Sequence, residues 1–232
     1  MNRQNDKCLL FFVKYPAEGQ VKTRLCTELG VGTVISLYRN FVLDLLYSIE
    51  KLNINFEVCF HPDRAKTKFV QWLGDKYSYR AQSGKDLGER MKNAFLRTFG
   101  INFTRVIIIG SDSPDLPADY INLAFSALLT HDVVIGPSDD GGYYLIGFCK
   151  KAFLPGALEG IGWSGKSVCE QTIRILRKHK CKVYLLPQWY DVDTAADLKL
   201  LLQRNKNTSF IKSATMSYSK QYKLEDKLNV RL

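Results

Sequence analysis

The chain has 232 residues, 46% of them hydrophobic, which is enough for one substantial core. It contains no run of 18 apolar residues, so we expect no transmembrane helix, and its polar start lacks the apolar stretch of a signal peptide. The formal net charge is +10, but residues 204–232 hold seven basic and two acidic residues, so the remainder is only mildly basic and suits a small anionic ligand.

Strand-like and helix-like runs alternate along the chain, which predicts a single α/β domain with a mostly parallel sheet flanked by helices. We expect strands over 7–13, 56–60, 105–110, 132–136, 143–148 and 182–186. We expect helices over 30–52, 65–73, 86–99, 117–129, 165–179 and 195–203, with Thr194 as the N-cap of the last. Residues 1–204 form the predicted domain, and residues 205–232 are a basic C-terminal extension that is either ordered or mobile.

The six cysteines are scattered, form no CxxC pair and often sit in apolar runs. They are Cys8, Cys26, Cys59, Cys149, Cys169 and Cys181. This usage fits neither a zinc site nor a disulfide framework, so we expect reduced thiols and a cytoplasmic protein.

The first candidate loop, residues 14–25, follows the first predicted strand. Gly19 allows the backbone to approach a ligand closely, and Lys22 and Arg24 supply cationic donors for phosphate. A pyrophosphate site and a solvated basic loop are equally good interpretations of this composition. The loop has neither the P-loop nor the GxGxxG pattern.

The second loop, residues 110–117, follows the most apolar strand, and its aspartates would lie at the carboxyl edge of the sheet, where open α/β folds bind ligands. Mg²⁺ or Mn²⁺ is often held by one or two carboxylates together with substrate phosphates, so Asp112 is the best candidate metal ligand. Asp115 either takes part in the site or shapes the turn.

The third loop contains Asp139, Asp140, Gly141 and Gly142, where adjacent carboxylates and two glycines favour a substrate site. The Asp-Gly pair also predicts a hairpin turn, and both interpretations can hold together.

The fourth loop contains Asp191 and Asp193, whose alternate spacing points both side chains the same way in an extended chain. They either complete a metal site with Asp112 or cap the next helix. Trp163, in a Gly-rich turn, either stacks on a sugar or base or anchors a lid in the core.

Six segments in order, KYPAEGQVKTRL, DLGERM, GSDSPDLP, GPSDDGGYYLIG, GWS and YDVDT, resemble the bacterial DUF2064 family over about residues 8–202. This family is glycosyltransferase-like and belongs to the GT-A (Rossmann-like) nucleotide-diphospho-sugar transferase superfamily. The resemblance implies a GT-A fold, a bound nucleotide and a divalent metal, Mg²⁺ or Mn²⁺. It departs from the usual DxD motif, because Ser113 and Pro114 follow Asp112, a pattern closer to that of nucleotidyltransferases.

The resemblance assigns roles by position. The implied nucleotide-binding residues are Lys14, Lys22, Arg24, Gln82, Leu87 and Gly88. The implied metal ligands are Asp112 and Asp193. Asp140 is the expected general base, and the expected acceptor-side residues are Asp139, Gly141, Gly142, Tyr143 and Trp163.

The leading hypothesis is a transferase that moves a glycosyl group from a nucleotide-diphospho-sugar to an unknown small-molecule acceptor. The alternative is a nucleotidyltransferase that joins an NTP to a phosphorylated small molecule and releases pyrophosphate. The charge also raises a nucleic-acid-binding role, but no helix concentrates Lys and Arg on one face. A non-catalytic nucleotide sensor and a homodimeric assembly remain open.

Overall fold

A computed structural model describes residues 6–163 and 165–228 of the chain. Within these residues seven strands form one sheet, in the order β3-β2-β1-β4-β6-β5-β7. The strands are β1 (Lys7–Lys14), β2 (Asn55–His61), β3 (Tyr79–Ala81), β4 (Arg105–Ile109), β5 (Val133–Pro137), β6 (Tyr143–Cys149) and β7 (Val183–Leu185). Strand β6 runs antiparallel to both of its neighbours, and the other pairings are parallel. The predicted α/β class with a mostly parallel, mixed sheet is confirmed.

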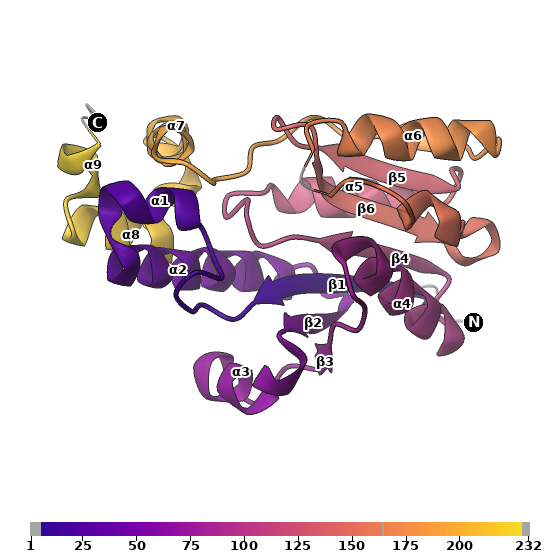
Figure 1. The fold of residues 1–232 in the computed structure, drawn as a ribbon, viewed down its shortest axis with the longest axis horizontal. Helices are drawn as coiled ribbons and strands as arrows, with labels where there is room; N and C mark the ends of the chain where they lie inside the picture. The colour runs from indigo at the N-terminus through magenta and orange to yellow at the C-terminus, as the bar shows by residue number, and fades with distance from the viewer. Residues whose placement is uncertain (1–5, 164, 229–232) are drawn as a thin grey trace.

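Helices cover both faces of this sheet (Figure 1). The α-helices are α1 (Thr23–Leu29), α2 (Val31–Glu50), α3 (Lys66–Leu73), α4 (Leu87–Gly100), α5 (Ala118–Ala127), α6 (Val168–Lys178), α7 (Ala195–Asn205), α8 (Ala214–Gln221) and α9 (Leu224–Lys227). Short 3₁₀ turns are η2 (Asp63–Ala65), η3 (Lys150–Ala152), η4 (Pro155–Leu158) and η5 (Ser209–Lys212). None of the helices in the described part of the chain is both long and apolar enough to cross a membrane.

Two apolar clusters lie on opposite faces of the sheet. Leu9 and Phe11 of β1 join the cluster that includes α2, α3, α5 and α7, whereas Leu10 and Phe12 join the cluster of α4 and α6. Successive side chains of a strand point to opposite faces, so the continuous apolar run of β1 is buried on both sides. This explains why the first strand has no polar alternation.

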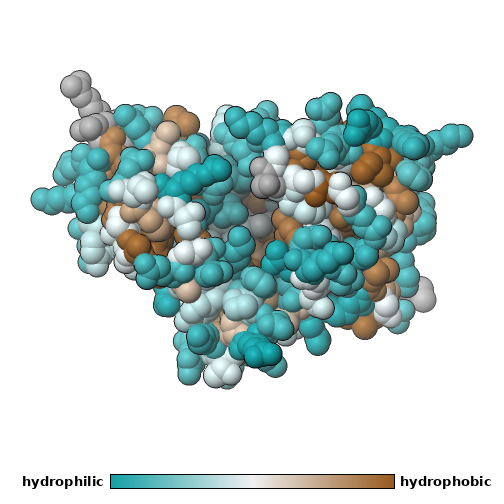
Figure 2. Space-filling view, viewed as in Figure 1, coloured by the Kyte–Doolittle hydropathy of each residue, from teal (hydrophilic) through white to brown (hydrophobic). Residues whose placement is uncertain are grey.

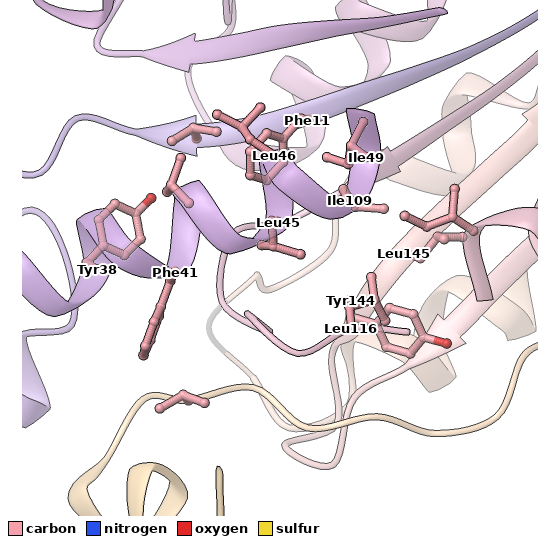
Figure 3. Close-up of a cluster of buried hydrophobic side chains, with 14 of the residues drawn as sticks. Phe11, Tyr38, Phe41, Leu45, Leu46, Ile49, Ile109, Leu116, Tyr144 and Leu145 are labelled. Carbon is pink, nitrogen blue, oxygen red and sulfur yellow. The ribbon is translucent and has the colours of Figure 1, made fainter. Parts of the chain in front are cut away.

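The long helix α2 packs its apolar stripe against the sheet. Tyr38, Phe41, Leu45 and Ile49 are all buried, as their spacing of three and four residues predicts. Figure 3 shows this stripe together with Phe11 of β1 in one cluster of buried side chains. The helix thereby fixes the position of the loop that follows β1.

The sequence-based boundaries are wrong in four places. The predicted loop over residues 14–25 ends too late, because residues 23–29 form α1, in which Leu25 and Leu29 are buried one helical turn apart. Strand β3 was not predicted, since it is only three residues long and pairs with β2 alone. Helix α6 begins at Val168 and not at residue 165, and Pro117 is the N-cap of α5, outside its first turn.

Thr194 is the N-cap of α7, as predicted. Its hydroxyl accepts a hydrogen bond from the N–H of Asp197, whose carboxylate accepts one in return from the N–H of Thr194. This capping box fixes the backbone at the point where the fourth candidate loop meets α7.

The C-terminal extension packs against α2 over its described part, which ends at residue 228. The buried carboxylate of Asp44 accepts hydrogen bonds from the backbone N–H groups of Ala214 (2.8 Å) and Thr215 (2.9 Å) at the start of α8. Figure 1 shows α8 and α9 beside α1 and α2, at the end of the molecule away from β5. Of the two alternatives for the C-terminal extension, ordered or mobile, its described part therefore follows the first.

Candidate active site

A cleft of about 400 Å³ opens at the carboxyl ends of β1 and β4. Its polar edge contains Lys14, Lys22, Asp112 and Asp193, and its inner wall includes apolar side chains such as Ile108. Figure 2 shows the molecule hollowed between the end that carries α1 and α7 and the part that carries α4 and α6. Loops that are far apart in the sequence thus meet at one sheet edge, as expected for an open α/β fold.

Lys22 joins the two predicted metal ligands. Its side chain is only 3% exposed, and its ammonium contacts Asp112 and lies 2.7 Å from Oδ1 of Asp193. Burial opposes the charge of Lys22, but the two carboxylates outweigh it and raise the pKa of this lysine. Burial likewise acts to raise the pKa of Asp193, but the neighbouring charge of Lys22 prevails and lowers it. The three side chains form one charged cluster with a net charge of −1.

The two carboxylates remain accessible from the cleft, with the side chains of Asp112 and Asp193 49% and 44% exposed. Within the residues described, no group of three or more His, Cys, Asp or Glu side chains is arranged to hold a metal. A divalent ion bound by one or two carboxylates takes its remaining ligands from water and substrate phosphate. The pair Asp112 and Asp193 fits an ion of that kind.

The loop after β4 is tied to the fourth loop. The hydroxyl of Ser113 donates a hydrogen bond to Oδ1 of Asp191 at 2.6 Å, and the N–H of Val192 donates one to the carbonyl oxygen of Asp112 at 2.9 Å. Burial, and secondly the charge of Asp112, raises the pKa of Asp191 to about 7. Asp193 therefore contacts Lys22, while Asp191 holds the two loops together.

Tyr38 ties the same loop to β1. Its buried hydroxyl lies 2.8 Å from Oγ of Ser111 and accepts a hydrogen bond from the N–H of Lys14 at 3.1 Å. Burial raises the pKa of this tyrosine, so it stays neutral. No sequence motif pointed to this link, because Tyr38 lies in the apolar stripe of α2.

Three of the predicted nucleotide-binding residues besides Lys22 line the cleft: Lys14, Gln82 and Leu87. The amide of Gln82 is buried and donates a hydrogen bond to the carbonyl of Cys59 at 2.7 Å. Arg24 is exposed and does not line the cleft, although its charge contributes to the low pKa of Asp193.

Gly88 lies behind the cleft wall, under Trp163. A Cβ atom at Gly88 would lie 2.6 Å from the indole of Trp163 and 2.1 Å from the carbonyl oxygen of Leu158. The indole also meets Tyr143 edge-on, with ring centroids 6.3 Å apart. Of these side chains, Tyr143 lines the cleft.

The third loop forms the hairpin turn between β5 and β6. Oδ1 of Asp140 accepts hydrogen bonds from Ser138 and from the N–H of Gly142 (2.9 Å), and Gly141 has a φ of +91°. Asp139 and Asp140 are exposed, and neither they nor the two glycines are part of the cleft lining. The turn interpretation of this loop is confirmed, and a role in binding an acceptor stays a prediction.

Arg90 also lines the cleft, and the sequence analysis did not single it out. Its Nε donates a hydrogen bond to the carbonyl oxygen of Asp86, the N-cap of α4. The signal that would have found it is spacing: Arg90 lies three residues after Leu87, on the same side of the helix.

The fold and the cleft define the chain as an open α/β protein with a ligand-sized cleft at the carboxyl edge of its sheet. The chain belongs to a family described as uncharacterized proteins conserved in bacteria, DUF2064, whose model matches residues 47–165. A crystal structure of a proposed nucleotide-diphospho-sugar transferase from Desulfovibrio desulfuricans G20 is 42% identical, with a TM-score of 0.91 over 96% of each chain. No curated protein matches the chain.

More distant structures share the fold. A cytidylyltransferase from Leptospira borgpetersenii is 15% identical, with a TM-score of 0.55 over 98% of each chain. A Mycobacterium tuberculosis H37Rv protein in complex with manganese is 14% identical, with a TM-score of 0.53 over 85% of this chain and 98% of its own. At such identities the likeness concerns the fold alone.

Proposed function

We propose that the chain is a metal-assisted transferase that binds a nucleotide-diphospho-sugar in the cleft and transfers its glycosyl group to a small-molecule acceptor. The observation that carries this proposal is the cluster of one buried lysine and two half-exposed carboxylates at the sheet edge. The relative from Desulfovibrio desulfuricans G20, similar over nearly its whole length, supports the same class of donor.

The reaction forms a bond from an acceptor oxygen to the anomeric carbon and breaks the bond from that carbon to the β-phosphate oxygen. Negative charge then builds on the departing nucleoside diphosphate. Lys14 and Lys22 line the cleft and supply cations where this group would lie, and Arg24 adds a positive charge outside the cleft lining. Asp112 and Asp193 would hold a divalent ion, which when bound neutralises part of the leaving-group charge.

The acceptor must lose a proton in this reaction, and Asp140 is our candidate for the base. Its Oδ1 is engaged in the hairpin turn, and its Oδ2 makes no hydrogen bond to any described residue. Asp139 and Tyr143 flank the same turn. If Asp140 is the base, Asp140→Asn lowers kcat without weakening binding of the nucleotide.

Nucleotidyl transfer is the second candidate, and the origin of the carboxylates favours it. They come from two loops, Asp112 after β4 and Asp193 before α7, and Ser113 follows Asp112 where a DxD motif has its spacer. In this reaction a phosphate oxygen attacks the α-phosphorus of an NTP, and pyrophosphate leaves. The same cations would stabilise the transferring group.

Thermal stabilisation by a panel of nucleotide sugars and NTPs, each with and without Mg²⁺ or Mn²⁺, tests the proposal. A ligand at 100 times its Kd adds about 2.7 kcal/mol to the stability of the native protein. We expect a metal-dependent rise in Tm with one nucleotide class, lost in Asp112→Asn and kept in Asp119→Asn, an exposed aspartate on α5.

Product analysis then separates the two reactions. Release of nucleoside diphosphate supports glycosyl transfer, and release of pyrophosphate supports nucleotidyl transfer. If no nucleotide shifts the Tm with either metal, the cleft is not a nucleotide site and the proposal fails.

A further inference from the structure

The ammonium of Lys22 already occupies the contacts that a metal ion would need. It touches both Asp112 and Asp193, and its side chain is almost wholly withdrawn from solvent. An ion that binds Oδ1 of both carboxylates would compete with this ammonium, because the ammonium contacts these same two oxygen atoms. The ammonium therefore reduces the net charge of the carboxylate pair from −2 to −1.

The backbone holds Lys22 in this place. The residue has a φ of 47°, in the left-handed region that is rare for residues other than glycine, and it is the N-cap of α1. Its carbonyl oxygen accepts a hydrogen bond from the N–H of Leu25 at 2.9 Å. Because α1 begins directly after Lys22, the helix fixes the backbone position from which this side chain extends.

We propose that Lys22 is an internal counter-cation that competes with the divalent ion for Asp112 and Asp193. The inference rests on the proposed function, since it concerns the metal ligands of that site. The lysine holds the carboxylate pair together through its contacts with both. A phosphate group that draws the ammonium into the cleft frees both carboxylates, so nucleotide and metal strengthen each other's binding by the same factor.

This role and a simple phosphate contact predict opposite effects on the metal. If Lys22 only contacts phosphate, its removal leaves the affinity for Mn²⁺ alone unchanged. If it competes for the carboxylates, its removal leaves a cluster of net charge −2 and Mn²⁺ binds more tightly. Lys14 provides the matched control, because it is a cation lining the same cleft that forms no ion pair with either carboxylate among the described residues.

The experiment is a titration of the intact protein with Mn²⁺ in the absence of nucleotide, followed by the EPR signal of free Mn²⁺. We expect Lys22→Met to bind Mn²⁺ at least about fivefold more tightly than wild type, the lower end of ordinary coupling between two sites. Lys14→Met should change the affinity by about twofold or less, because an unpaired charge in water is screened. Lys22→Gln serves as a second variant if Lys22→Met melts below the assay temperature.

A second readout follows the amine itself. Acylation of Lys22 in wild type, measured by mass spectrometry, should rise when saturating Mn²⁺ displaces the ammonium, while acylation of Lys14 stays constant. Unchanged or weaker Mn²⁺ binding in both Lys22 variants would overturn the inference, as would Mn²⁺ binding to none of the proteins.

Failure of this inference is distinct from failure of the proposed function. If nucleotide and metal stabilise wild type but the Lys22 variants bind Mn²⁺ no more tightly, the transferase site stands and the competition does not. If no nucleotide stabilises the protein but Lys22→Met gains affinity for Mn²⁺, the competition is supported and the transferase proposal falls.

Discussion

Asp115 anchors the loop after β4 to the C-terminal part of the molecule, so we expect Asp115→Ala to be strongly destabilising. Its side chain is 3% exposed and accepts hydrogen bonds from Nε and Nη2 of Arg204 at 2.7 and 2.8 Å. Nδ2 of Asn205 (2.6 Å) and Nε1 of Trp189 (3.3 Å) also donate to it. The substitution leaves these donors without their acceptor.

The cost follows from the burial of the pair. Removing one partner of a buried ion pair costs about 3–5 kcal/mol, and the 22% exposure of the Arg204 side chain favours the lower end, about 3 kcal/mol. An unfolding entropy of about 2.1 cal/mol/K per residue gives about 0.5 kcal/mol/K for a chain of this length, so Tm should fall by about 6 °C. Calorimetry of the purified variant measures both quantities.

Two further variants make this test specific. Asp119→Ala removes an exposed aspartate from the first turn of α5, where the helix dipole contributes about 0.3–1 kcal/mol, so its Tm should fall by about 2 °C or less. In the double variant Asp115→Ala with Arg204→Met, the loss should be smaller than the sum of the single losses, because no charge is left unpaired. If Asp115→Ala melts within about 2 °C of Asp119→Ala, the anchor contributes little and the reasoning is refuted.

The other predictions concern a turn, a helix cap and the thiols. Gly141→Ala should lower the free energy of unfolding, measured with denaturant, by at least about 1–3 kcal/mol. The reason is that φ of Gly141 is +91° and the new Cβ would lie 1.8 Å from the carbonyl oxygen of Lys166. An unchanged unfolding midpoint would contradict the turn geometry. Asp44→Ala should cost about 1–3 kcal/mol and raise hydrogen exchange selectively in α8, whose first N–H groups lose their acceptor; uniform exchange across the chain would contradict this. With a thiol reagent at pH 8, the half-buried Cys26 should react in the native protein. Burial raises the pKa of Cys8 to about 12, so Cys8 should react only on unfolding. Equal reaction rates of the two thiols would refute this difference.

The sequence predicts the sheet well where apolar runs are long. The segments of β1, β4 and β6 are continuous apolar stretches, which is the pattern expected for strands buried on both faces of a sheet. Strand β3 has no such signal, because its three residues pair with one neighbour at the sheet edge. The sequence did not reveal helix α1, because its seven residues lie between a polar loop and α2.

The candidate site could be predicted as a set of loops but not as a set of contacts. A carboxylate directly after an apolar strand pointed to Asp112, because the carboxyl ends of strands share one edge. Alternate spacing pointed to Asp191 and Asp193 together, and the family resemblance singled out Asp193. The sequence held no sign that Lys22 would bridge them across 171 residues. The same holds for Asp115, whose arginine partner lies 89 residues away, so its turn-shaping and site interpretations both missed the anchor.

In the loop after β4, some side chains anchor the backbone, whereas Asp112 faces the cleft. Its odd-numbered side chains face the protein: Ser111 meets Tyr38, Ser113 donates to Asp191, and Asp115 binds Arg204. Asp112, between two anchored serines, is half exposed at the cleft. Because its neighbours fix the backbone on both sides, the carboxylate is positioned before any ligand binds, as a binding group should be. Asp112→Asn should therefore alter ligand binding, and it should cost less stability than Asp115→Ala, three residues on, because Asp112 is half exposed and Asp193 still pairs with Lys22.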